Sequence, residues 1–220
     1  MIGLRFGRPR NGELSILCLG AHSDDIEIGC GATLLELSRR YPMARIAWHV
    51  MAASDVRKDE ARASAEYFTR GFAESKIVIH DFPDGLFPVQ LAELRSTLEA
   101  AKMAGEPDVV FTHFRADLHQ DHRTVGEVTW QTFRDALILE YEIAKYDGDI
   151  GAPNCFFPVS ADDRRNKIEA LERYFPSQRG KDWFDKSTFS ALMRIRGVEC
   201  RATSGYAEAF YMSKAVLFTE

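Results

Sequence analysis

Cysteine is scarce in this sequence, and its few residues are widely separated. The chain of 220 residues contains four of them, Cys18, Cys30, Cys155 and Cys200, and no two form a Cys-x-x-Cys pair. This spacing argues against a disulfide framework and favours buried free thiols in a reducing compartment. A chain of this length buries about 70% of its unfolded surface, so it needs no disulfide or metal ion merely to fold.

Long apolar runs and targeting signals are also missing. No stretch approaches the roughly 20 apolar residues that a membrane-spanning helix needs. Arg5, Arg8 and Arg10 interrupt the amino-terminal segment, which therefore lacks the apolar core and the cleavage site of a secretory signal. We therefore expect a soluble, cytoplasmic protein that does not insert into a membrane.

The sequence has no excess of basic residues. Its 28 Lys and Arg are outnumbered by 33 Asp and Glu, which gives a formal net charge of −5, and the basic residues are scattered. This argues against nucleic acid as a partner, because proteins bind it through clustered positive charge. No linker-like stretch divides the chain. Since domains contain about 100–200 residues, we expect residues 1–220 to form a single domain.

Short apolar runs alternate with amphipathic stretches along the first 140 residues. The runs predict strands at 15–19, 45–52, 76–80 and 108–112. Helices are predicted through 34–37, after Ser54, over 91–103 and from about 124 to 137. Beyond residue 139 we expect strands at 141–146, 155–159 and 209–218 and a helix over 162–174.

Strands that alternate with helices favour right-handed βαβ units. The predicted fold class is therefore α/β, Rossmann-like, with a mostly parallel sheet and helices on both of its faces. In such sheets, ligands bind outside the carboxyl ends of the strands.

Four of the six histidines fall in two short loops, each of which directly follows a predicted strand. The first loop contains His22, Asp24 and Asp25, and the second contains His113, Asp117, His119, Asp121 and His122. Two imidazoles and one carboxylate, from His22, His122 and Asp25, leave an open position for water, as catalytic zinc sites do. Asp24 can then take a proton from metal-bound water, and Asp121 can fix the tautomer of a neighbouring imidazole.

Both loops resemble a known family. The stretch LCLGAHSDDIEIGCGATL at 17–34 resembles the Ala-His-Pro-Asp-Asp motif of the LmbE-like, PIG-L-type zinc deacetylases, and the run from Asp117 to His122 resembles their Asp-x-His-x-Asp-His motif. Ser23 stands where the family usually has Pro, and Ala32 where it has a second Gly. Neither departure removes a reacting group. Weaker similarities occur at Arg57-x-x-Glu60, Asp84-Gly85, Ser177-Gln178, Arg196-Gly197 and 206–210.

The resemblance implies a zinc ion held by His22, Asp25 and His122, although iron(II) can occupy such sites. It implies that Asp24 is the general base. His119 would stabilise the oxyanion or protonate the departing amine, with Asp121 orienting its ring.

Substrate contacts and partners are also implied by the resemblance. Arg57 and Asp84 match positions where relatives grip sugar hydroxyls, and His113 is a candidate for substrate binding or for support of the metal. The implied substrate is a small N-acetylated amino sugar or a conjugate that contains one. Relatives are often homo-oligomers.

Three alternative functions remain open at this stage. The same residues suit an amidase that acts on a thiol conjugate or another non-sugar amide. Two histidines and one carboxylate also form the triad of non-haem iron oxygenases, although oxygen chemistry has no use for a spare base such as Asp24. The third alternative is a sugar- or nucleotide-binding module without catalysis, against which the presence of both Asp24 and His119 argues.

Overall fold

One mostly parallel β-sheet organises the residues that the computed structural model describes, which are 3, 6 and 12–216. Within this part of the chain, seven strands are arranged in the order β3-β2-β1-β4-β5-β7-β6. Neighbours from β3 to β5 pair in parallel, whereas β7 is antiparallel to both β5 and β6. The strands are β1 (Ser15–Gly20), β2 (Arg45–Val50), β3 (Glu74–Ile79), β4 (Val109–His113), β5 (Leu137–Tyr141), β6 (Cys155–Pro158) and β7 (Ala207–Tyr211).

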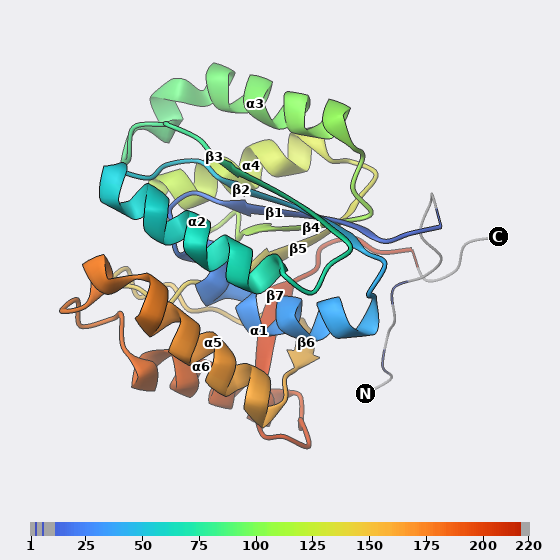
Figure 1. Ribbon diagram of the computed structural model, residues 1–220, viewed down its shortest axis with the longest axis vertical. Helices are drawn as coiled ribbons and strands as arrows, with labels where there is room; N and C mark the ends of the chain where they lie inside the picture. Colours follow the sequence, from blue (N-terminus) through green and yellow to red (C-terminus); the bar gives the residue numbers. More distant parts are fainter. Residues whose placement is uncertain (1–2, 4–5, 7–11, 217–220) are drawn as a thin grey trace.

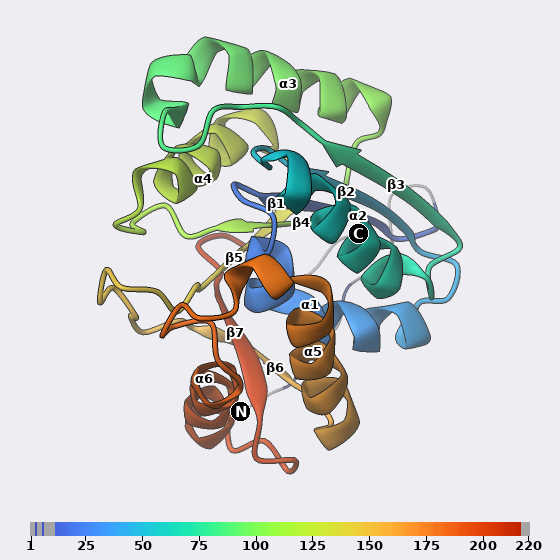
Figure 2. The same ribbon diagram turned by 60° about the vertical axis from the view of Figure 1, so that its left-hand side comes forward.

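Helices cover both faces of this sheet (Figure 1). One face carries α1 (Asp25–Arg40), α2 (Asp55–Thr69) and α5 (Ala161–Tyr174), which pack against one another. The opposite face carries α3 (Leu91–Ala104) and α4 (Gln120–Thr132), together with the short 3-10 helix η1 (Phe87–Gln90). The helix α6 (Lys186–Glu199) lies against β7, and the 3-10 turn η2 (Pro176–Gln178) contacts α2 (Figure 2). The expected α/β fold class is therefore confirmed.

The strand sequences explain why both faces are covered. In β1, Ile16 and Cys18 enter the core beneath α1, α2 and α5, whereas Leu17 and Leu19 enter the core beneath α3 and α4. Successive side chains of a strand point to opposite faces, so a continuously apolar strand requires a helix layer on each side. The same division holds in β4, where Val109 and Phe111 face one core and Val110 faces the other.

The first four predicted strands, the strand at 155–159 and the helices over 91–103 and 162–174 are confirmed, but other elements of the second half required corrections. The helix expected over about 124–137 is α4, which begins at Gln120 and ends at Thr132. Leu137–Tyr141 forms β5 instead, so the strand expected at 141–146 is wrong. The helix α6 was not predicted. The last strand is Ala207–Tyr211 rather than 209–218, and residues 217 and 218 of that prediction lie outside the described residues.

The sheet order determines where a site can form. β1 and β4 are neighbours, yet the chain leaves β1 toward β2 on one side and leaves β4 toward β5 on the other. A crevice forms at such a switch point, outside the carboxyl ends of the two strands. The loops that follow β1 and β4 are the two loops that contain the histidine and aspartate clusters.

Two further expectations concern cysteine and membranes. The four cysteines, all of which the structure describes, are free thiols. Among the described helices, none combines the length and the apolar character required to cross a bilayer.

Candidate active site

The loop between β1 and α1 folds back on itself and brings His22 close to Asp25. Asp25 is the first residue of α1, and its Oδ2 accepts the backbone N–H of His22 at 2.6 Å. The backbone N–H of Ala21 donates to Nε2 of His113, at the end of β4, at 2.9 Å. The loop is thus attached both to its own helix and to the neighbouring strand.

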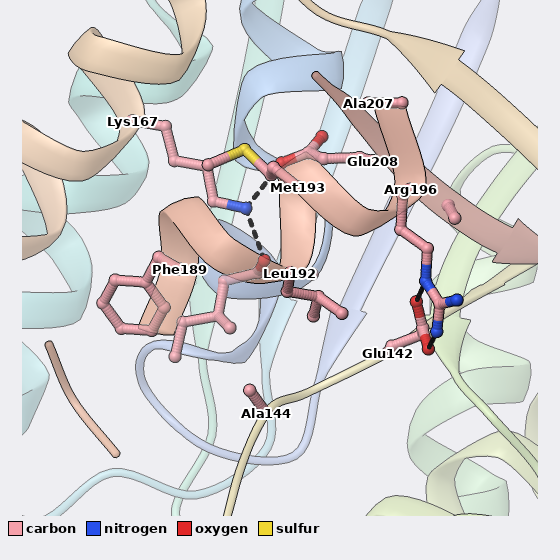
Figure 3. A pocket seen from close by; sticks show the side chains of 12 residues that line it. Glu142, Ala144, Lys167, Phe189, Leu192, Met193, Arg196, Ala207 and Glu208 are labelled. Atoms are coloured by element: carbon pink, nitrogen blue, oxygen red, sulfur yellow. Dashed lines mark hydrogen bonds and ion pairs between the residues drawn. The ribbon is translucent and has the colours of Figure 1, made fainter. Parts of the chain in front are cut away.

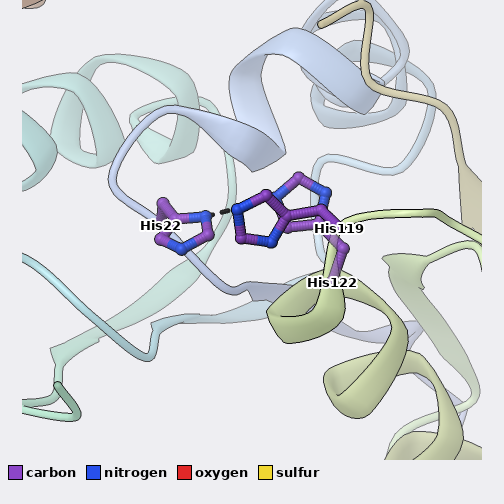
Figure 4. Close-up of side chains that lie close together, drawn as sticks. All are labelled: His22, His119 and His122. Carbon is purple, nitrogen blue, oxygen red and sulfur yellow. Dashed lines mark hydrogen bonds between the residues drawn. The ribbon is translucent and has the colours of Figure 1, made fainter. Parts of the chain in front are cut away.

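His122 reaches the same place from the second loop. The N-cap residue of α4 is His119, whose Nδ1 accepts the backbone N–H of Asp121 at 3.3 Å. A helix that begins at Gln120 carries His122 in its first turn, where the imidazole faces His22 (Figure 4). Histidine is not among the preferred N-cap residues, which explains why the sequence pattern predicted a later start.

Three candidate ligands converge between these two loops, with each carboxylate oxygen of Asp25 near one of the two imidazoles. His22 Nδ1 lies 3.1 Å from His122 Nε2 and 3.4 Å from Asp25 Oδ2, and His122 Nε2 lies 3.6 Å from Asp25 Oδ1. Ligands held about 2.0–2.1 Å from a tetrahedral zinc ion are about 3.3 Å apart. The observed separations therefore suit such an ion without large rearrangement.

The outward-facing ring nitrogens support the same interpretation. His122 Nδ1 lies 3.2 Å from Asp117 Oδ2. His22 Nε2 lies 3.0 Å from Asp84 Oδ1 and 3.4 Å from Asp121 Oδ2. Carboxylates favour N–H groups at these outer nitrogens, so the inner nitrogens, which share one hydrogen bond in this structure, can both turn lone pairs to a cation that displaces the proton between them. Two lone pairs and a carboxylate that point at one another form a donor set suited to a cation.

The electrostatics of the two ligand types are complementary. Burial lowers the pKa of His22, but hydrogen bonds with carboxylates, foremost Asp121, raise it well above its ordinary value. Burial raises the pKa of Asp25, but the imidazoles of His122 and His113 hold it well below its ordinary value. The site therefore favours an ionised carboxylate together with positive charge, which a proton or a metal ion can provide.

Asp24 lies next to this donor set but has different contacts. It is the N-cap residue of α1, and its Oδ1 accepts a hydrogen bond from Nη2 of Arg57 at 2.8 Å. Its other oxygen, Oδ2, is buried and has no hydrogen-bond partner among the described residues. Burial raises the pKa of Asp24, and the guanidinium of Arg57 opposes this. Arg57, which was expected to contact substrate, thus holds the candidate base in this structure.

His119 is partly exposed beside the ligand rings. Its ring centroid lies 4.5 Å from that of His122 and 5.0 Å from that of His22. Burial lowers the pKa of His119, and His122 and His22 lower it further, so the neutral form is favoured. The backbone N–H of Asp121 occupies Nδ1, so the neutral ring carries its proton on Nε2 and can donate a hydrogen bond there.

The carboxylate of Asp121 does not make the contact that the sequence suggested. Its oxygens accept the backbone N–H groups of Gly85 at 2.6 Å and Phe87 at 3.1 Å, and Oδ2 faces Nε2 of His22. The expected pairing of this carboxylate with His119 is corrected accordingly, because the loop after β3 folds over α4 and draws it toward His22. The backbone amide of Asp121, rather than its side chain, orients His119.

The substrate-binding role expected for His113 also needs correction. The residue is completely buried behind the ligands, and its ring stacks on that of His122 with centroids 4.0 Å apart. Burial lowers its pKa to about 4. Its Nε2 lies 3.1 Å from Asp25 Oδ2, near enough to form another donor set with Asp25 and His122. However, this nitrogen already accepts the N–H of Ala21, so His113 supports the ligand loop from behind.

Two further residues lie near the candidate ligands, of which Asp117 already stood out in the second histidine loop and Lys145 did not. Asp117 contacts Nδ1 of His122, and its Oδ1 accepts the backbone N–H of His119 at 2.8 Å. Lys145 lies in the loop after β5, and its Nζ is 3.0 Å from Asp117 Oδ1 and 2.6 Å from Asp149 Oδ2. Asp117 carried a signal, because it lies five residues before His122, whereas nothing in the sequence connects Lys145 with this loop.

The fold and the site together define a class: Rossmann-like α/β proteins with a candidate hydrolytic centre of histidines and aspartates at the switch point of the sheet. The family is identified by a family model, PIG-L, described as GlcNAc-PI de-N-acetylase, which matches residues 17–133. The chain belongs to the PIG-L family, and the resemblance found in the sequence is confirmed.

Individual relatives agree with this assignment. The uncharacterized deacetylase YaiS of Escherichia coli (strain K12) is 34% identical over 144 residues, which cover 60% of this chain and 75% of that protein. The N,N'-diacetylchitobiose deacetylase of Pyrococcus horikoshii has 19% identity and a TM-score of 0.69, covering 96% of this chain and 90% of that one. The 4-carboxy-2-hydroxymuconate hydratase GalB of Pseudomonas putida KT2440 has 14% identity and a TM-score of 0.75, covering 94% and 99%. The last two comparisons show the fold alone.

Proposed function

We propose that this protein is a metal-dependent hydrolase that removes the N-acetyl group from an amino sugar or a sugar conjugate. The observation that carries this proposal is the convergence of His22 Nδ1, His122 Nε2 and the Asp25 carboxylate beside the unpartnered Oδ2 of Asp24. Membership of the PIG-L family supports the same reaction. Deacetylation of a small sugar is also the activity named for the Pyrococcus horikoshii structure.

His22, Asp25 and His122 would hold the ion, with zinc proposed and iron(II) as the alternative. When bound, such an ion supplies a Lewis acid for the amide carbonyl and lowers the pKa of a coordinated water to about 7. The protein contributes to the orientation of the ligands, because Asp117 is hydrogen-bonded to Nδ1 of His122 and the carboxylates of Asp84 and Asp121 face Nε2 of His22.

Asp24 is the proposed general base. Arg57 fixes one of its oxygens at 2.8 Å, and the other oxygen remains free to accept a proton from the attacking water. That proton then becomes available to the amine, which must leave in a protonated form.

His119 is the proposed donor to the oxyanion of the tetrahedral species. With Nδ1 held by the Asp121 backbone amide, its Nε2–H can donate a hydrogen bond without first gaining a proton. Asp121 itself supports His22. Asp84, whose side chain is 67% exposed, and Arg57 are proposed to contact sugar hydroxyls.

The test is acetate release from N-acetyl amino sugars offered in free, nucleotide-linked and lipid-linked form, with zinc-loaded protein. We expect release from at least one of the three, and none with His122→Ala. Acetate release from none of them, combined with cleavage of an N-acyl thiol conjugate, would favour the amidase. In a parallel assay with iron(II)-loaded protein, turnover that requires oxygen and a reductant would instead identify the iron oxygenase.

A further inference from the structure

A second group of charged residues is buried in the interior, away from the histidine loops. Lys167 on α5 and Glu208 on β7 form an ion pair in which Nζ and Oε1 are 2.6 Å apart, with side chains 3% and 2% exposed. They line a small cavity that is also bordered by Glu142 and Arg196 (Figure 3). The proposed reaction uses none of these groups.

The contacts of this pair lie on the backbone of α1. Glu208 accepts the backbone N–H groups of Ala32 at 3.0 Å and Thr33 at 2.6 Å, and Lys167 donates to the carbonyl of Ile28 at 2.5 Å. Ile28 C=O and Ala32 N–H are partners in a regular α-helix, four residues apart. Side chains of α5 and β7 therefore hydrogen-bond to the backbone of the same turn of α1. This turn follows the one that begins with Asp25.

Tyr141 on β5, the strand next to β7, contacts the same part of α1. A Cβ added to Gly29 would lie 2.3 Å from the Tyr141 ring, so only glycine allows this close approach. The Tyr141 hydroxyl donates to the carbonyl of Leu19, near the end of β1, at 2.6 Å. The first turns of α1 are thus attached to the end of β1 through Tyr141 and, through backbone hydrogen bonds, to the Lys167–Glu208 pair.

A buried ion pair is a weak source of stability, because desolvation offsets much of the attraction between its charges. Apolar side chains of similar volume would fill this space as well or better. A buried ion pair instead fixes the relative positions of the elements that it joins, because each charged group must hydrogen-bond to partners at defined positions. Here the Lys167–Glu208 pair fixes the backbone of α1, the helix whose amino-terminal end carries Asp24 and Asp25.

We propose that Lys167 and Glu208 are positioning residues, which set the first turns of α1 so that Asp24 and Asp25 lie opposite His122. This rests on the proposed function, because the donor set that they position is the proposed metal site. Lys167 and Glu208 contribute to the proposed function without contacting either the ion or the substrate.

The test compares zinc affinity, measured by competition with a chelator, in wild type and in two variants. Glu208→Gln, and the neutral pair Lys167→Met with Glu208→Gln, should each weaken zinc binding by about 10–100-fold, as loss of indirect support for metal ligands commonly does. The neutral pair leaves no single charge buried, so it remains informative if Glu208→Gln fails to fold. Lys167→Arg keeps the cation and should retain zinc affinity within a few-fold of wild type.

The neighbouring pair of Arg196 and Glu142 provides a matched control. Its side chains are 3% and 6% exposed, with Nη2 and Oε1 2.5 Å apart, and the other hydrogen bonds of Arg196 go to Glu199 and Gly151 rather than to α1. Glu142→Gln should lower the melting temperature of the zinc-free protein and leave zinc affinity unchanged.

Native zinc affinity in both Glu208 variants would overturn the proposal, as would an equal loss of affinity in Glu142→Gln. Wild type that binds zinc but releases no acetate would refute the proposed reaction and leave the positioning role standing. Wild type that binds no zinc would refute both.

Discussion

Two adjacent aspartates show how strongly local geometry separates residues of the same type. Asp25 faces the rings of His22 and His122, whereas Asp24 faces Arg57 and leaves one oxygen unpaired. The difference arises because α1 begins between them, so that Asp24 is the N-cap residue and Asp25 the first helical residue. A carboxylate on one side of the helix start can bind an ion while its neighbour accepts protons.

Asp24→Asn should therefore retain zinc and lose about 10²–10⁴-fold in kcat, the usual contribution of a general base. Asparagine keeps the shape and one oxygen for Arg57 but cannot accept the proton. The measurement is zinc content per chain together with steady-state kinetics of acetate release. Asp25→Asn serves as the comparison and should lose zinc. Near-native turnover by Asp24→Asn would assign the base to another group.

Asp121→Asn tests the corrected role of that carboxylate. In the structure it accepts the N–H groups of Gly85 and Phe87 and faces Nε2 of His22, so it holds a ligand ring. An amide has one acceptor in place of two, and zinc affinity should fall by about 10–100-fold. His119→Ala should instead keep zinc and lower kcat. Unchanged affinity in Asp121→Asn, with a shifted pH profile of activity, would restore the pairing with His119.

The spacing of residues could bring the candidate ligands together but could not predict the residues that contact them from behind. His22, Asp25 and His122 follow strands whose carboxyl ends meet, which a sequence pattern can indicate. The contact between Asp121 and His22 depends on the loop after β3 folding over α4, and the position of Lys167 depends on α5 packing against α1. Such contacts join segments far apart in the chain, and no local pattern encodes them.

At the scale of elements, the helix α4 determines how closely His122 approaches β4. Gly126 lies on its buried side, where an added Cβ would be 2.7 Å from the backbone oxygen of His113 and 3.3 Å from the backbone nitrogen of Arg115. Backbone atoms cannot rotate away as side-chain atoms do. The close contact between helix and strand therefore requires glycine at this position.

Gly126→Ala should lower the free energy of unfolding by about 1–3 kcal/mol, the usual cost of overpacking. The control is Gly105→Ala, because Gly105 has open space around its Cβ position and an extended backbone with φ of 172°. That change should stay within about 0.5 kcal/mol of wild type. Urea denaturation of both variants gives the comparison, and equal stabilities would show that α4 shifts without cost.

Two elements, α6 and β5, were not predicted because their sequences lack the usual signals of a helix or of a turn. In α6 the buried face consists of Phe189, Met193, Arg196 and Gly197, whereas Ile195 and Val198 are 52% and 58% exposed. Because Arg196 and Gly197 are buried while Ile195 and Val198 are exposed, the sequence of α6 lacks the apolar periodicity of an amphipathic helix. A short turn without Gly or Pro joins α4 to β5. From the sequence alone, the apolar residues of β5 therefore resemble a continuation of the helix.

Across the whole molecule, β1 and β4 were predictable because each is apolar on both sides and contributes side chains to both cores. The carboxyl-terminal part is less regular, since β7 runs antiparallel between β5 and β6 and its partners lie far away in sequence. This part nevertheless reaches the helix that follows the first histidine loop, because Glu208 on β7 and Lys167 on α5 hydrogen-bond to the backbone of α1.

The stability of the whole molecule should depend on pH through His49, which lies on β2 away from the metal ligands. Burial lowers the pKa of His49 to about 4, with smaller contributions from His80, whose Nε2 is 3.1 Å from its Nδ1, and from Lys76. In the unfolded chain the pKa returns to about 6.5. Between these values the unfolded chain binds a proton that the folded chain does not. The free energy of unfolding therefore falls as the pH falls through this window.

From pH 7 to pH 5, this titration should cost wild type about 2 kcal/mol. His49→Gln cannot titrate, so its unfolding free energy should fall by that much less over the same interval. The packing change made by glutamine is present at both pH values and cancels in the difference. The histidines other than His80, which contacts His49, contribute equally to both proteins. Urea denaturation at the two pH values measures the effect. Identical pH dependence in variant and wild type would mean that His49 keeps an ordinary pKa in the folded protein.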